Sequence, residues 1–377
     1  MSKVLFTAST YSHIVNFHRP YLAAFRQLGW TVEVACGGTP MEIPEAHRVV
    51  YIPFEKEMLS LRNGTAWRQL RRLMKDERYD LVSCHTSLAS FFTRMAVRGL
   101  RNRPKVACVA HGYLFGEDTS AVKGMLLKGA ERLAAPVTDL LMTMNHWDTQ
   151  YAEAHQLGKQ IVEVPGIGLD TGRLRPVSGE ERAALRSEWG IAEGEILLLY
   201  AAEFSGRKSQ QVLIRAMTRL PERVKLALPG QGTLREVCMA LAAQLRVEER
   251  VLFPGQVQMA QWYGVADLAV SASRSEGLPF NIMEAMYCGL PVVASRVKGH
   301  TDLLEESGAG LLYPYGDWAA CAGCIQELLQ DRELADRMGE RGRQAVEAYT
   351  LDRVQPVVMA QYGTLAPLGQ PASAGSV

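Results

Sequence analysis

Two glutamates, Glu276 and Glu284, lie eight residues apart across what reads as a junction between a loop and a helix. Pro279 suits the first position of a helix, where a missing N–H costs nothing, and Gly289 suits its end. Glu276 is therefore expected in the loop, and Glu284 more than one turn inside the helix. The unpaired backbone N–H groups between them would favour a phosphate, and the two carboxylates could accept hydrogen bonds from sugar hydroxyls. A nucleotide-sugar carries this combination of groups.

Glutamates at this spacing also occur on solvated helix surfaces, so the flanking sequence has to decide between the two readings. An apolar run at residues 268–270 precedes the pair, and a second apolar run at 291–295 follows it. Both runs are typical of buried strands. Open α/β sheets bind ligands at the carboxyl ends of their strands, so this context favours a ligand site.

The elements around this site follow a regular alternation of strands and helices. Strands are expected at 4–8, 31–35, 81–84, 106–110 and 140–144, and a second series runs from 196–201 to 310–312. This alternation predicts an α/β protein with parallel sheets covered on both faces. The break lies at 165–170 and in a polar stretch to about Glu181, which reads as a linker.

We therefore predict two domains that face each other across a central cleft, with the switch points of both sheets lining it. Residues 1–170 form the first domain, and 171–348 the second. Residues 349–368 are expected to pack back on the first domain, and 369–377, which are small and polar, to form a disordered tail.

Composition fits this organisation and narrows the class of partner. The chain has 377 residues, enough for two domains, and its formal net charge of +1 does not indicate a nucleic-acid partner. Lys and Arg outnumber Asp and Glu by 21 to 16 in residues 1–173, whereas the remainder has 20 against 24. The basic half could face an anionic lipid or an anionic acceptor, the alternative being ordinary surface variation.

The sequence predicts a cytoplasmic protein. It runs from Met1-Ser2-Lys3 straight into a strand, with no signal peptide and no apolar run as long as a membrane span. Its seven cysteines are scattered, which fits reduced thiols.

Further short motifs follow one another along nearly the whole chain. Histidines come in Ser12-His13-Ile14, Phe17-His18, Cys84-His85-Thr86 and Ala110-His111-Gly112, before a glycine-rich turn at Leu228-Pro229-Gly230-Gln231-Gly232. In this order, with the paired glutamates, the chain resembles glycosyltransferase family 4. That family has the GT-B architecture of two Rossmann-like, doubly wound parallel-sheet domains facing a central cleft. The resemblance is strongest to its bacterial exopolysaccharide and capsule branch.

The resemblance implies a retaining transfer of a sugar from a nucleotide-sugar, expected to be a UDP-sugar, to a saccharide or polyprenyl-diphosphate-linked acceptor. It also implies that no metal or other cofactor is needed, and no acidic cluster that would hold Mg²⁺ at a strand end is visible. Lys208 matches the phosphate-binding lysine of the family. Glu203 stands where many members have an arginine, and Arg207 could take over that role.

The remaining roles are carried over from the family position by position. Glu284 is expected to bind the ribose, Glu276 the donor sugar or adjacent phosphate, and the backbone of Gly230 and of Gly277, Leu278, Pro279 and Phe280 the donor as a whole. His111 matches a histidine near the donor sugar, where it could orient a hydroxyl or stabilise positive charge through its backbone carbonyl. An acceptor or phosphate contact is expected from His13, in a loop after the first strand, and acceptor contacts from His18 and His85. A buried, hydrogen-bonded histidine is the alternative for His18 and His85.

A membrane contact is a further expectation. A basic helix carries Arg68, Arg71, Arg72 and Lys75, and residues 123–133 mix cations with Met125, Leu126 and Leu127. Both segments could dock peripherally on the anionic inner face of the cytoplasmic membrane, the alternative being a solvated surface.

Three other functions remain open at this stage. A nucleotide-sugar epimerase on the same architecture would act without an acceptor. An inactive carbohydrate- or lipid-binding protein would not need Lys208, Glu276 and Glu284. A dinucleotide oxidoreductase would carry G-x-G-x-x-G after the first strand, where this chain has Ser9-Thr10-Tyr11-Ser12-His13.

Overall fold

The computed structural model describes residues 2–369 apart from 56, 58–59, 117–118 and 175–176. The chain divides into two compact units, which are described separately. The first contains the residues up to Ile167 and those from Val354 on, and the second is Gly168–Arg353. The chain therefore leaves the first unit once and returns to it at its end. Residues 370–377, most of the expected disordered tail, lie outside the described residues.

The first unit is built on a parallel sheet with the strand order β3-β2-β1-β4-β5-β6-β7. The strands are β1 (Lys3–Ala8), β2 (Thr31–Cys36), β3 (Arg48–Tyr51), β4 (Leu81–His85), β5 (Lys105–Val109), β6 (Leu140–Thr143) and β7 (Gln160–Glu163). Every residue of β4 is buried, as expected for a strand covered on both faces. The chain winds in opposite directions from β1 and β4, so the switch point lies between their carboxyl ends.

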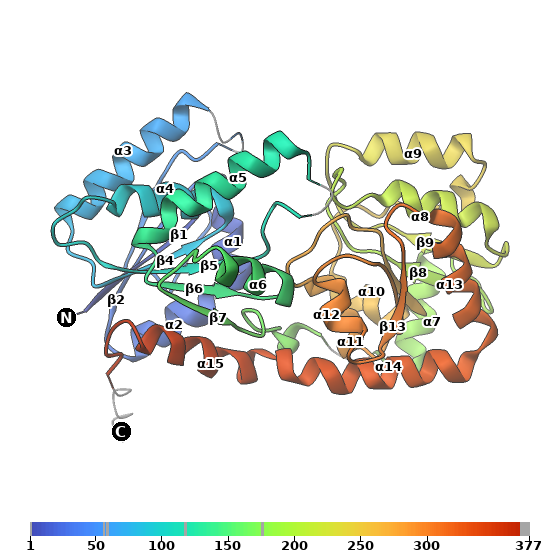
Figure 1. The fold of residues 1–377 in the computed structure, drawn as a ribbon. Coiled ribbons are helices and arrows are strands. Elements are labelled where there is room, and N and C mark those ends of the chain that lie inside the picture. Colours follow the sequence, from blue (N-terminus) through green and yellow to red (C-terminus); the bar gives the residue numbers. More distant parts are fainter. Residues whose placement is uncertain (1, 56, 58–59, 117–118, 175–176, 370–377) are drawn as a thin grey trace, which may run out of the picture. The chain divides into compact units, whose positions relative to one another are not determined.

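Helices cover both faces of this sheet. They are α1 (Tyr11–Phe17), α2 (Arg19–Gln27), α3 (Leu61–Asp76), α4 (Ser87–Val97), α5 (Ala121–Ala134), α6 (His146–Ala154) and α15 (Leu351–Gly363). Within this unit α3, α4 and α5 lie on one side of the sheet, with α2 and most of α15 on the other (Figure 1). The last helix, α15, packs on the first unit through Tyr362, which is buried against Phe6 and Phe25.

The helix α1 corrects the expectation that His13 lies in a loop. The side chain of Thr10 accepts a hydrogen bond from the backbone N–H of His13, which starts a helix directly after β1. The helix has seven residues, of which only Tyr11 and Ile14 are buried, so it is too short to show an apolar periodicity.

The second unit repeats the design with the strand order β10-β9-β8-β11-β12-β13, again parallel. The strands are β8 (Ile196–Leu199), β9 (Val224–Ala227), β10 (Val251–Leu252), β11 (Leu268–Ser271), β12 (Val292–Ser295) and β13 (Gly310–Tyr313). The helices are α7 (Gly179–Glu188), α8 (Gln210–Ala216), α9 (Arg235–Gln244), α10 (Met259–Val265), α11 (Phe280–Tyr287), α12 (His300–Leu304), α13 (Trp318–Gln330) and α14 (Arg332–Val346). Here the switch point lies between β8 and β11.

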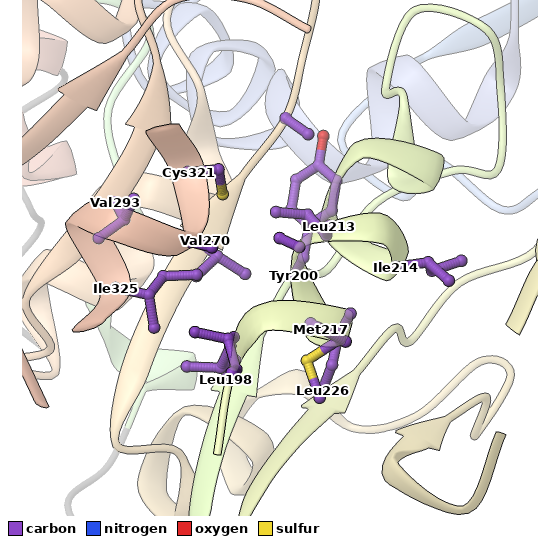
Figure 2. Packing of buried hydrophobic residues seen from close by; sticks show 14 of the residues in the cluster. Leu198, Tyr200, Leu213, Ile214, Met217, Leu226, Val270, Val293, Cys321 and Ile325 are labelled. Atoms are coloured by element: carbon purple, nitrogen blue, oxygen red, sulfur yellow. The ribbon is translucent and has the colours of Figure 1, made fainter. Parts of the chain in front are cut away.

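The core of the second unit lies between the sheet and the helices α8 and α13. Figure 2 shows Leu198 and Val270 from two neighbouring strands beside Ile325 of α13, with Leu213 and Met217 from the α8 side. Tyr200 follows β8 and has its ring in this core, but its hydroxyl reaches the loop that precedes α8. The core therefore holds in place the loops at the carboxyl ends of the central strands.

These two parallel α/β sheets confirm the fold class expected from the sequence. None of the described helices is both long enough and apolar enough to cross a membrane.

Candidate functional site

The paired glutamates flank the start of α11, as expected. Pro279 is the N-cap of this helix rather than its first residue, because its backbone is extended (φ −81°, ψ 107°). Glu276 lies in the loop after β11, and Glu284 is in the second turn of α11. The helix ends at Tyr287, and Gly289, the residue after its C-cap, adopts φ +76°, a conformation that glycine reaches without strain.

The loop between β11 and α11 is packed tightly against the start of α12. A Cβ on Gly299 would lie 2.4 Å from the carbonyl oxygen of Gly277, and Gly299 has φ +82°. Gly277, Leu278 and Pro279 are buried, whereas Phe280 is half-buried. The backbone that the sequence assigned to donor binding is therefore held in one conformation by its neighbours.

Glu276 forms ion pairs with the two basic residues that precede α8. Its Oε1 lies 2.5 Å from Nζ of Lys208, and its Oε2 lies 3.1 Å from a guanidinium nitrogen of Arg207. Burial alone would raise the pKa of Glu276, but the charges of Lys208 and Arg207 outweigh it and lower the pKa to about 2. The carboxylate is ionised at neutral pH, and the cluster of three side chains keeps one net positive charge.

Backbone contacts fix this cluster at the switch point of the second unit. The hydroxyl of Tyr200 donates to the carbonyl oxygen of Lys208 at 3.0 Å and lies 2.7 Å from Oγ of Ser273. The N–H of Arg274 donates to the carbonyl oxygen of Arg207 at 2.7 Å. The loops after β8 and β11 are thus joined at the level of the ion pairs, so Lys208 and Glu276 meet although 68 residues separate them.

Arg207 supplies the second positive charge of the ion-pair cluster, although Glu203 stands where many family members have an arginine. Glu203 is exposed, and its carbonyl oxygen accepts a hydrogen bond from the side chain of Gln210. The departure from the family pattern at Glu203 therefore leaves the ion-pair cluster with two cations.

Glu284 takes part in a separate hydrogen bond. The hydroxyl of Tyr263 on α10 donates to its Oε2 at 2.6 Å. Burial raises the pKa of Glu284, and the bond from Tyr263 opposes that shift. The side chain of Glu284 is half-buried and accepts this one hydrogen bond from Tyr263, so its carboxylate can accept further hydrogen bonds from hydroxyl groups of a ligand.

Gly230 has a structural reason to be glycine. Its φ is +147°, and a Cβ there would lie 2.1 Å from the carbonyl oxygen of Ala202. Its own N–H already donates to the carbonyl oxygen of Gly255 at 2.8 Å. Gly230 therefore lets the loop after β9 pass close to the loop after β8, and its amide is occupied within the protein.

The four predicted histidines come together in the first unit, at the switch point between β1 and β4. His13 lies on α1, His18 between α1 and α2, His85 at the end of β4, and His111 after β5. Nε2 of His111 lies 3.4 Å from Nε2 of His13 and 3.3 Å from Nδ1 of His85. Burial lowers the pKa of His13 to about 4 and holds the pKa values of His18, His85 and His111 well below the usual range. All four rings are neutral at pH 7.

Sequence reasoning missed several residues that support these sites. They are Tyr200 and Tyr263, and also His300, whose Nδ1 donates to the carbonyl oxygen of Ser295 at 2.7 Å. Burial lowers the pKa of His300 to about 4, against the opposing charge of Glu276. The sequence signal for His300 was its place after Gly299, one loop beyond a buried strand.

Comparisons with known proteins assign the chain to a family. The family profile described as Glycosyltransferase Family 4 matches residues 21–167, and the profile described as Glycosyl transferases group 1 matches residues 181–345. The chain is 32% identical to "Putative glycosyltransferase EpsD" of Bacillus subtilis (strain 168) over 95% of this chain and 96% of that protein.

Solved structures share the fold at lower identity. The sucrose-phosphate synthase of Thermosynechococcus elongatus superposes with a TM-score of 0.80 at 20% identity, covering 97% of this chain and 99% of that one. The Anabaena protein HepE, solved in complex with UDP-glucose, gives a TM-score of 0.78 at 20% identity, covering 97% and 100%.

Proposed function

The chain belongs to glycosyltransferase family 4 and is a glycosyltransferase of the GT-B type, and we propose that it is a retaining enzyme that uses a UDP-sugar as donor. The observation that carries this proposal is the cluster of Lys208, Arg207 and Glu276 beside the start of α11, with Glu284 in the second turn of the same helix. Two cations and a helix N-terminus suit a diphosphate, and the carboxylates suit hydroxyls. The Anabaena relative in fold was solved with UDP-glucose, which supports uridine as the base.

In this proposal the leaving diphosphate is neutralised by side chains, without a metal ion bound to it. Lys208 and Arg207 would turn from Glu276 toward the phosphate oxygens, because the diphosphate as a whole carries more negative charge than the single carboxylate of Glu276. Glu276 would then be free to accept from the donor sugar or bridge to the phosphate through Lys208. Glu284, already held by Tyr263, would accept from the ribose hydroxyls.

The retaining course rests on the family resemblance and on the kind of side chain present. A double displacement would need a nucleophile with an adjacent base, and the cations beside Glu276 make that carboxylate a weak one. We propose same-face attack, in which the leaving phosphate accepts the acceptor's proton. His111 would orient a hydroxyl or stabilise the anomeric carbon through its backbone carbonyl.

The acceptor is proposed to be a glycan or a polyprenyl-diphosphate-linked saccharide, reached by peripheral contact with an anionic membrane. Helix α5 supports this, because Val122 (76% exposed) and Met125 (72% exposed) stand out beside Leu126 and Leu133. Lys123 and Arg132 are exposed on the same helix. Apolar side chains flanked by cations are typical of helices that lie in a membrane interface. Helix α3 fits less well, because Arg71 donates to Ala96 and Arg98 and Arg72 pairs with Asp76.

The donor is tested by thermal unfolding of the full chain with UDP, GDP, ADP, several UDP-sugars and NAD. A ligand at a hundred times its dissociation constant adds about 2.7 kcal/mol to the stability of the folded state, a readily measured shift. We expect UDP and at least one UDP-sugar to stabilise the protein. We also expect Glu284→Ala to weaken UDP binding more than about tenfold, because a hydrogen bond to a charged group is lost. Stabilisation by NAD alone, or by none of these ligands, would overturn the proposal.

The membrane contact is tested by cosedimentation with vesicles. Binding should rise with the fraction of anionic lipid and fall in a variant carrying Val122→Ser and Met125→Ser. The exposed Val237 of α9 provides a control substitution, Val237→Ser, that should leave binding unchanged. Equal binding to neutral and anionic vesicles would count against this part of the proposal.

A further inference from the structure

The histidine cluster of the first unit has the composition of a metal centre. One ring nitrogen from each of His13, His18, His85 and His111 lies within 4.8 Å of all the others. The four rings come from separate segments that meet at the carboxyl ends of β1, β4 and β5. His18 and His85 are each 1% exposed, whereas His13 and His111 are half-buried. The cluster is therefore closed on its inner side and accessible on its outer side.

The spacing of the ring nitrogens fits a tetrahedral metal ion. Zinc–nitrogen bonds of about 2.0–2.1 Å in a tetrahedron place the ligand nitrogens about 3.3–3.4 Å apart. The two shortest contacts in the cluster, from Nε2 of His111 to His13 and to His85, are 3.4 and 3.3 Å. Both contacts exceed the range of about 2.7–3.2 Å that N–H···O hydrogen bonds take in proteins.

Counting protons shows that hydrogen bonds among the rings leave some of the nitrogens unsatisfied. A neutral imidazole has one N–H and one lone pair, yet Nε2 of His111 faces two other ring nitrogens at once. Among the described residues Nε2 of His18 has no hydrogen-bond partner, although this ring is buried. A buried polar atom without a partner is costly, and a metal ion would accept these lone pairs together.

The neighbours of His85 orient it as a ligand. Its Nε2 lies 2.9 Å from Oγ of Ser83, which in turn lies 2.6 Å from the hydroxyl of Tyr362. With Nε2–H donated to Ser83, the lone pair is on Nδ1, the atom that faces His111. Metal-binding histidines typically donate their other N–H in this way, which fixes the tautomer and the ring orientation.

We propose that His13, His18, His85 and His111 bind one divalent transition-metal ion of the zinc class. Imidazole nitrogens are good ligands for Zn²⁺, and one ring nitrogen of each of the four histidines lies within 4.8 Å of the other three. The ion would join α1, the connection to α2, β4 and the loop after β5, and so would fix the switch point of the first unit. This proposal departs from the expectation, implied by the family resemblance, that the protein needs no metal or other cofactor. With its ring bound to the ion, His111 would act in the proposed reaction through its backbone carbonyl rather than by orienting a hydroxyl. Metal binding would likewise replace the acceptor contacts expected of His13, His18 and His85.

The test uses the full chain, purified with its affinity tag removed. The metal content is measured by mass spectrometry, and Zn²⁺ and Co²⁺ are then titrated into chelator-treated protein. We expect one ion per chain, a rise in melting temperature of about 5 °C at a hundredfold excess of Zn²⁺ over its dissociation constant, and the visible bands of four-coordinate Co²⁺. Substoichiometric binding of both ions, with no change in melting temperature, would overturn the proposal.

Three variants localise the binding without relying on activity. His13→Gln lies at the accessible side and should fold normally. It should weaken Zn²⁺ binding more than about 100-fold, because even outer partners of a metal ligand contribute 10- to 100-fold. Ser83→Ala, which removes the partner of His85, should weaken binding about 10- to 100-fold. The control His146→Ala removes an exposed histidine of the same unit and should bind as the wild type does. Unchanged affinity in both His13→Gln and Ser83→Ala, with folding checked by circular dichroism, would show that the ion binds elsewhere and overturn the proposal.

Discussion

The ion pairs of Glu276 show how single residues of the proposed donor site are prepared for an anion. Glu276 and Lys208 have side chains only 8% and 12% exposed, so neither charge is well hydrated without the other. Arg207, which is more exposed, adds the second positive charge. In the proposed donor site, the excess of one positive charge would attract the diphosphate, and Glu276 would keep the cations in position until it binds.

Removing Lys208 should therefore affect stability as well as activity. Lys208→Met leaves the buried carboxylate of Glu276 with only the more exposed Arg207, and we expect a loss of about 3 kcal/mol in the free energy of unfolding. The double variant Lys208→Met with Glu276→Gln should recover most of that loss, because no unpaired charge remains. Urea denaturation of the single and double variants measures this coupling. Equal stability of the single and double variants would mean that the pair is not coupled in solution.

The stability of the protein should also depend on pH through Glu276. Its pKa falls from 4.5 to about 2 on folding, so the folded state binds fewer protons than the unfolded state at intermediate pH. The resulting stabilisation, about 3 kcal/mol, is complete above pH 4.5 and is lost as the pH falls toward 2. Denaturation measured from pH 7 to 3 should show a steeper decline in wild type than in Glu276→Gln. Parallel curves for the two proteins would contradict the assignment.

At the scale of elements, glycines decide how closely the loops of the second unit approach each other. Gly299 and Gly194 both have φ +82°, but only Gly299 faces a neighbour, the carbonyl oxygen of Gly277. The two glycines therefore share a positive φ, and the close approach of a neighbouring backbone is found only at Gly299.

We predict that Gly194→Ala costs about 1–2 kcal/mol, the strain of a left-handed alanine. Gly299→Ala should cost clearly more, because its Cβ would lie 2.4 Å from a backbone oxygen. It should also weaken UDP binding, since the loop of Gly277 must move. Denaturation and calorimetric titration of both variants measure the two effects. Similar costs for both, with UDP affinity retained, would show that the loop adapts without consequence.

Much of this element-level organisation was predictable. The alternation of apolar runs and turns indicated two parallel sheets, and Pro279 and Gly289 marked the ends of α11 within two residues. His13 was misplaced, because a seven-residue helix capped by Thr10 has too few residues to show a period. The clustering of the four histidines and the pairing of Lys208 with Glu276 depend on which strands are neighbours in each sheet. Local sequence patterns do not encode this strand order. Tyr200 and Tyr263 were missed because a buried tyrosine gives the same signal as any core residue.

At the scale of the whole molecule, the chain's return to its first unit makes that unit depend on its last helix. The chain crosses at Ile167 and again at Arg353, and α15 then supplies Tyr362 to the interior of the first unit. Its ring contacts Phe6 and Phe25, and its hydroxyl lies 2.6 Å from Oγ of Ser83. The second unit, by contrast, is continuous in sequence and contains the proposed donor site. Stability of the first unit and donor affinity of the second should therefore be separable.

The variant Tyr362→Ala tests this separation. It should destabilise the first unit by about 3–5 kcal/mol, because a fully buried aromatic side chain is lost. Tyr362→Phe, which keeps the ring and loses only the contact with Ser83, should cost about 1 kcal/mol. Hydrogen exchange should accelerate in β1 and β4 of the alanine variant but not in β8 and β11. UDP affinity should stay within about twofold of wild type, since the proposed donor site belongs to the second unit. Exchange that accelerates equally in both sheets would mean that the two units unfold as one, and donor binding would then depend on the packing of α15 as well as on its own residues.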